Sequence, residues 1–141
     1  MSEPTRPDPH RWEEVVRWLF HANDDLGVVD AILMQSSRSL FGAALHCQQA
    51  AEKMAKAVPI AFGVRPPRIH DVDRLGDLVG AVHPEIGAEI QKLSQLTTWY
   101  AAARYPDVAA DSLPSLVDIR AALVKLRVLH QRIQSLAPQS R

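Results

Sequence analysis

Three short stretches of this sequence combine side chains that could hold a phosphate group. In the first, helical spacing places four polar side chains on one stripe beside Glu52, namely His46, Gln49, Lys53 and Lys56. The second is a stiff, locally basic loop that runs from Arg65 through two prolines to His70 and Asp71. The third is residues 99–107, which contain Tyr100, Arg104 and Tyr105.

These residue types suit phosphate and base recognition, but each has a structural alternative. Arg104 follows Tyr100 by one helical turn, so it could grip a phosphate while a tyrosine stacks on a base. It could equally be a structural staple, because a cation at the C-terminal end of a helix suits the helix dipole, and spacing alone favours the staple. Glu52 and Lys56 likewise form a routine i, i+4 ion pair on a wet helix face.

Most signatures of catalysis are missing from the sequence. It has no phosphate-binding glycine loop, no dinucleotide fingerprint, no His-Glu-x-x-His and no Gly-x-Ser-x-Gly. The six histidines do not pair at metal-binding spacing, and the single cysteine, Cys47, excludes a thiolate zinc cluster. We therefore expect no metal and no cofactor.

Length and composition indicate one small domain. The chain has 141 residues, 47% of them apolar, and its 16 basic side chains balance 16 acidic ones. Net charge thus favours neither nucleic acid nor membrane as a partner. With no apolar run of about 18 residues and no signal peptide, the expectation is a cytoplasmic protein without a membrane span.

Hydrophobic spacing predicts an all-α, up-and-down helical bundle of four long helices plus one short helix. Residues 10–136 would form the bundle, with flexible tails at 1–9 and 137–141. The five helices are expected near 10–34, 39–62, 72–82, 84–104 and 113–136. Alanines dominate the apolar face of the second helix, which predicts close packing at the centre of the bundle.

The last helix has an apolar surface wider than one neighbour needs. Beside its main stripe runs a second one, made of Val117, Ala121, Val124 and Val128. This width indicates either burial within the bundle or a homodimer contact. Charge is also uneven, with a net of −4 over residues 1–36 and +4 over residues 113–141. The two ends could therefore attract each other or leave a basic face exposed.

The three stretches also occur together in a known family. A helix reading Cys-Gln-Gln-Ala-Ala-Glu-Lys-Met-Ala-Lys-Ala at 47–57, a loop ending His-Asp at 67–71 and Tyr-Ala-Ala-Ala-Arg-Tyr-Pro-Asp at 100–107 follow in order. This arrangement resembles the HEPN family (higher eukaryotes and prokaryotes nucleotide-binding domain) over roughly residues 12–135.

The resemblance implies a helical bundle that commonly dimerises and often works with a small nucleotidyltransferase, in pairs that behave as toxin–antitoxin modules. It implies a nucleotide or RNA phosphate as ligand. The positions that match the family's shared polar residues are Gln49, Glu52, Lys53, Lys56, His70, Asp71, Arg104 and Tyr105. Lys53, Lys56, His70 and Arg104 would hold phosphate, Tyr100 or Tyr105 a base, and Gln49, Glu52 and Asp71 would line the groove.

The wider superfamily includes metal-independent ribonucleases, in which an Arg precedes a His by four to six residues on a late helix. Here Arg127 and His130 are only three apart, and the one pair with that spacing, Arg65 and His70, lies in a loop. Binding without catalysis is therefore the first hypothesis. An endoribonuclease toxin with His70 as acid/base is the alternative, and a non-catalytic assembly module is a second alternative.

Overall fold

A computed structural model describes residues 6–36, 39–104 and 114–139, with side chains except at residue 100 and residues 102–104. These residues form helices without any strand, as the sequence predicted. A short 3₁₀ turn, η1 (Pro9–Arg11), precedes six α-helices. The helices are α1 (Trp12–Leu33), α2 (Leu40–Ala61), α3 (Val72–Val82), α4 (Pro84–Gln91), α5 (Gln95–Arg104) and α6 (Leu116–Gln134).

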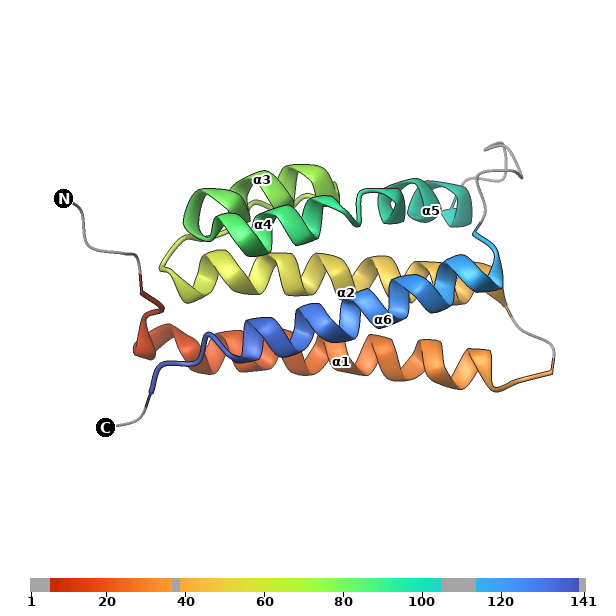
Figure 1. The fold of residues 1–141 in the computed structure, drawn as a ribbon, viewed down its shortest axis with the longest axis horizontal. Helices are drawn as coiled ribbons and strands as arrows, with labels where there is room; N and C mark the ends of the chain where they lie inside the picture. The colour runs from red at the N-terminus through yellow and green to blue at the C-terminus, as the bar shows by residue number, and fades with distance from the viewer. Residues whose placement is uncertain (1–5, 37–38, 105–113, 140–141) are drawn as a thin grey trace.

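The long helices α1, α2 and α6 lie side by side, with α2 and α6 running in one direction and α1 in the opposite one, while α3, α4 and α5 cover α2 from the other side (Figure 1). Helices α4 and α5 follow one another along the bundle and together take the place of the fourth long helix. The start of α1 and the end of α6 lie at the same end of the molecule. None of the described helices is long and apolar enough to cross a bilayer.

The single helix expected over 84–104 is divided in two by a turn at residues 92–94. In the turn, Leu93, Ser94 and Leu96 donate backbone hydrogen bonds to carbonyls three residues earlier, as in a 3₁₀ helix. The apolar side chains here recur every third residue, and all are buried: Ile90, Leu93, Leu96 and Trp99. A straight α-helix would rotate such a series off the core, so the tighter turn keeps it inside.

Side-chain caps set where the helices begin. The Ser39 hydroxyl accepts from the Gly42 amide at 3.0 Å, and Asp71 caps α3, as its position predicted. Helix α6 begins at Leu116 rather than near 113, because Ser115 and Asp118 form a reciprocal capping box. Ser112, the cap expected from the sequence, lies outside the described residues.

Helix α2 is central, as its alanines predicted, and packs against α1, α3, α5 and α6. Its fully buried face consists mainly of small side chains, which are Ala43, Ala44, Cys47, Ala50, Ala51, Ala55 and Ala57. Small residues let neighbouring helix axes approach closely. Burial also raises the pKa of the Cys47 thiol to about 12, so this cysteine is an uncharged core residue.

Glycines bring α3 and α4 into contact. A Cβ atom placed on Gly87 would overlap the backbone of Gly80 and lie 3.0 Å from the Gly76 carbonyl oxygen. The two helices therefore touch backbone to backbone. This close crossing holds α3 in place, and α3 in turn fixes the loop before it.

Helix α6 closes the bundle on α1. The His130 imidazole donates from Nε2 to the Leu19 carbonyl at 3.0 Å inside the core. Nearer the surface, the Arg127 guanidinium pairs with the Asp30 carboxylate. The acidic first segment and the basic last segment are thus neighbours, one of the two outcomes that their charge allowed.

Candidate functional site

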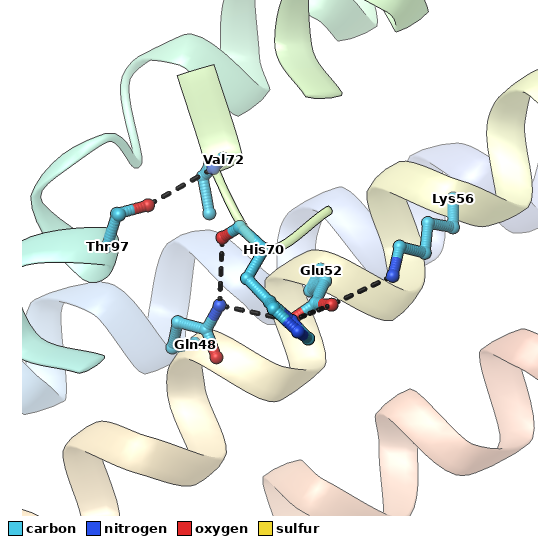
Figure 2. A network of polar contacts seen from close by, with 6 residues as sticks. All are labelled: Gln48, Glu52, Lys56, His70, Val72 and Thr97. Atoms are coloured by element: carbon cyan, nitrogen blue, oxygen red, sulfur yellow. Dashed lines mark hydrogen bonds and ion pairs between the residues drawn. The ribbon is translucent and has the colours of Figure 1, made fainter. Parts of the chain in front are cut away.

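The Glu52 carboxylate is the centre of a polar network between α2 and the loop that precedes α3 (Figure 2). Its Oε1 accepts from Lys56 Nζ at 2.8 Å and contacts His70 Nδ1 at 2.7 Å. Only 10% of the Glu52 side chain and 12% of the Lys56 side chain are exposed, against 63% of His70. The carboxylate is thus shielded, and the imidazole that it orients lies at the surface.

Gln48 supports this network from beneath. Its amide nitrogen donates to Glu52 Oε2 at 3.1 Å and to the His70 backbone carbonyl at 3.3 Å. The residue is completely buried, and its Oε1 atom has no hydrogen-bond partner among the residues that the structure describes. Gln48 therefore fixes both the carboxylate and the backbone of the loop, a role that its position in the sequence did not reveal.

The same loop is tied to α5. The Val72 amide donates to Thr97 Oγ1 at 3.1 Å (Figure 2). One residue earlier, Asp71 Oδ1 accepts from the Asp73 amide at 2.9 Å, so this carboxylate caps α3. Thr97 lies near the start of α5, about two helical turns before Arg104. The loop therefore connects α2 with the helix that carries the third motif.

Three of the candidate residues belong to that third motif. Tyr100 and Arg104 lie within α5, but their side chains are outside the described part of the chain, and Tyr105 lies outside it altogether. The described contacts accordingly bring together Glu52, Lys56 and His70, and place Asp71 beside them.

Lys53 belongs to a different contact, on the α1 side of α2. Its ammonium pairs with Asp25 Oδ2, while His46 Nδ1 contacts Asp25 Oδ1 at 2.8 Å. Only 8% of the Asp25 side chain is exposed. The sequence predicts that these polar residues form one stripe along a groove. In the structure the stripe is divided, because Lys53 and His46 face α1 and Lys56 faces the loop. The half-buried Gln49 lies on α2 between the two groups.

Arg65 anchors the start of the loop to α1. Its two terminal nitrogens donate to the two Glu14 oxygens at 2.6 and 3.2 Å. This guanidinium holds the pKa of Glu14 below its ordinary 4.5, with a smaller contribution from the Trp18 hydrogen bond. Arg65 and His70 therefore bind carboxylates on different helices, although their spacing matches the ribonuclease motif.

Two cavities flank α1. A groove of about 620 Å³ between α1 and α6 is lined by residues such as Val16, Phe20 and Arg127. A smaller pocket of about 270 Å³ between α1 and α2 is lined by Glu14, Arg17, Trp18, His21 and Lys53. Apart from Lys53, no candidate residue of the sequence lines either cavity. Within the described residues, no three His, Cys, Asp or Glu side chains gather as metal ligands would.

A helical bundle whose polar residues converge from three separate segments is the arrangement expected of a HEPN domain. The family model for the HEPN domain matches residues 15–135, which is most of the chain. The protein therefore belongs to the HEPN domain family. Searches of curated proteins and of solved structures found no match.

Proposed function

We propose that this HEPN protein binds a nucleotide or an RNA phosphate at the surface around Glu52, Lys56 and His70, without catalysing a reaction. Arg104 would add a second cation, and Tyr100 or Tyr105 would stack on a base. The ligand's phosphate would receive charge-assisted hydrogen bonds from these cations. Glu52 orients the His70 side chain, and Gln49 and Asp71 would lie beside the bound ligand.

The observation that carries this proposal is the link between the three motifs. His70 contacts Glu52 of the first motif at 2.7 Å, and the loop residue Val72 is bonded at 3.1 Å to Thr97, on the helix that leads to the third. A polar network serving only the fold would not need an exposed imidazole at its edge. Here the buried carboxylate holds a largely exposed His70 in a fixed orientation.

Binding of a short RNA and of ATP tests this function directly. Wild-type protein should bind one of them with an affinity that falls as salt rises, because phosphate contacts release counterions. Lys56→Gln should weaken binding several-fold because it removes a cation that contacts the phosphate. Arg104→Lys should have a similar effect, since lysine cannot reproduce the bidentate geometry of arginine. Arg74→Gln, an exposed charge on α3, is the matched control and should leave affinity unchanged. If the wild-type protein binds neither the short RNA nor ATP, the proposal is refuted.

We also propose a partner protein, as the family resemblance of the three motifs implies. A minimal nucleotidyltransferase would bind this protein, and the two together would act as a toxin–antitoxin module in the cytoplasm. Co-expression with a nucleotidyltransferase encoded by the adjacent reading frame should give a complex that survives gel filtration. Separate elution of the two proteins, together with unchanged growth when either is expressed alone, would contradict this part.

A second candidate, an endoribonuclease toxin, is favoured by one contact. A carboxylate that contacts Nδ1 of a histidine orients the imidazole ring for acid/base catalysis, and Glu52 contacts His70 in this way. RNA cleavage in the presence of EDTA, lost in His70→Ala with unchanged melting temperature, would establish this activity. We expect no cleavage, because the late helix lacks the ribonuclease spacing.

We also propose that the protein is a homodimer formed through α6 and the neighbouring face of α1. Exposed valines follow α6 at Val117, Val124 and Val128, and Val16 and Phe20 are exposed across the groove on α1. Exposed apolar side chains on neighbouring helices often mark a protein–protein contact. The basic charge of α6 and the acidic charge of α1 would meet across a two-fold axis. An assembly module without a ligand, the remaining alternative, would share this dimer but bind neither ATP nor RNA.

A further inference from the structure

The pocket between α1 and α2 combines an aromatic ring with several cations. It lies on the α1 side of α2, whereas His70 contacts α2 from the side of the loop before α3. Helix α1 contributes the adjacent residues Arg17 and Trp18 and, about one helical turn later, His21, and α2 contributes Lys53. We propose that this pocket binds one nucleoside phosphate, with its base against Trp18 and its phosphate on Arg17, His21 and Lys53. The inference goes beyond the proposed function, because it adds a second binding site to the one around Glu52, Lys56 and His70.

The ring of Trp18 is held in place for such a contact. The residue is half-buried and packs against the core, and its indole hydrogen-bonds to Glu14. Glu14 is in turn fixed by both terminal nitrogens of Arg65. Because the ring is already positioned, a stacked base would order little of the protein on binding.

The charge of the pocket favours an anion. Its walls carry one carboxylate, Glu14, against three basic residues, Arg17, His21 and Lys53, of which Lys53 is also paired with Asp25. Glu14 is already neutralised by Arg65. Arg17 meets Glu13 only at 3.9 Å at the surface, a contact too long and too exposed to hold its guanidinium.

Lys53 brings a donor from the second helix. Its ammonium has three N–H donors, and the contact with Asp25 uses one of them. Asp25 also holds His46, so the lysine is positioned by a buried and shared carboxylate. Lys53 can therefore bind a phosphate oxygen without giving up its ion pair.

The size of the pocket limits the ligand to about one nucleotide. Its volume of about 270 Å³ lies just below the range that drug-sized ligands occupy, which is about 300–1,000 Å³. One base with its phosphate fits that space, whereas a folded RNA does not. The nucleotide could be free or could be the terminal nucleotide of an RNA chain.

Calorimetry with four probes tests the pocket: ATP, adenosine, inorganic triphosphate and a 5′-phosphorylated six-nucleotide RNA. We expect ATP to bind more tightly than adenosine or triphosphate. Trp18→Ala should weaken ATP binding about tenfold, and Trp18→Phe much less, because a ring is retained for stacking. Arg17→Gln should weaken ATP and triphosphate alike. The RNA should respond to these substitutions only if its terminal nucleotide is the ligand.

Matched controls on the same elements make the result specific. Trp12→Ala removes another half-buried tryptophan of α1, and Arg120→Gln removes an exposed arginine of α6, so neither should change ATP affinity. If ATP binding is weakened by Lys56→Gln but not by Trp18→Ala or Arg17→Gln, the pocket is wrong and the proposed function stands. If the wild-type protein binds none of the four probes, the proposed function itself fails.

Discussion

At the scale of single residues, the polar network of this site depends on one shielded carboxylate, that of Glu52. Glu52 receives hydrogen bonds from Gln48, Lys56 and His70, which come from two turns of α2 and from the loop. Loss of this carboxylate would leave all three donors without their acceptor. The integrity of this corner therefore depends on one residue more than on any of its cations.

Replacing Glu52 by Gln should lower the free energy of unfolding by about 2–3 kcal/mol, because Lys56 would be left nearly buried without its charge partner. Urea denaturation at pH 7 measures this. Glu13→Gln is the control, since Glu13 is 90% exposed, and its change should stay within about 0.5 kcal/mol. Equal effects of the two substitutions would show that the Glu52 network contributes nothing to stability.

The pair of Arg65 with Glu14 should make stability depend on pH. Because Arg65 lowers the pKa of Glu14 in the folded state, the pair stabilises the protein above pH 4.5 and loses its effect as pH falls through the lower, folded pKa. The difference in unfolding free energy between wild type and Arg65→Gln should thus be largest above pH 4.5 and shrink toward pH 3.

Urea titrations between pH 3 and pH 7 measure that difference. Arg68→Gln, a change at an exposed arginine of the same loop, should show a small offset that does not vary with pH. A wild-type to Arg65→Gln difference that stays constant over this range would mean that the pair does not stabilise the folded protein.

Among the helices, the crossing of α3 over α4 is the most demanding contact. Gly87 faces the backbone of Gly80 so closely that a methyl group cannot enter without moving a helix. Gly80 itself has open space where its own Cβ would lie. Two glycines at one crossing therefore have opposite tolerance for alanine.

Gly87→Ala should destabilise the domain by about 1–3 kcal/mol through overpacking. Gly80→Ala should be neutral or stabilising by up to about 1 kcal/mol, because alanine favours the helix. Thermal unfolding followed by circular dichroism distinguishes them. A melting temperature that falls equally in both variants would mean that helix contact is not the cause.

At the level of elements, hydrophobic periodicity predicted most of the helices. The side chains of other elements that each polar residue contacts could not be predicted in this way. Spacing placed Lys53 and Lys56 on one stripe of α2, but spacing gives only an angle around the helix axis. Which carboxylate each lysine meets depends on the elements packed beside α2. Asp25 was not among the candidate residues of the sequence, yet packing buries it against Lys53. The turn at residues 92–94 was missed because a three-residue apolar repeat also fits part of a helical stripe.

For the whole molecule, the exposed valines of α6 decide the oligomeric state. Val124 is 64% exposed, and Val124→Glu should convert the proposed dimer to a monomer without lowering the melting temperature. Light scattering should give about 31 kDa for the wild type, twice the chain mass of 15.6 kDa. Leu123, buried in the core beside it, should instead unfold the protein when replaced by Glu.

Met34→Glu is the control for this experiment, because Met34 is a highly exposed apolar residue directly after α1 and is not one of the residues of the proposed contact. It should leave the dimer intact. A wild-type particle of 15.6 kDa at micromolar concentration would rule out the dimer.

The bond from His130 to the Leu19 carbonyl joins residues 111 positions apart and sets an order of events during synthesis. A ribosome makes α1 and α2 before α6, which covers part of their apolar surface. That surface of the nascent chain therefore stays exposed until α6 emerges. A stop codon before Ile133 would remove part of the covering helix, so we expect such a chain to be degraded by proteases.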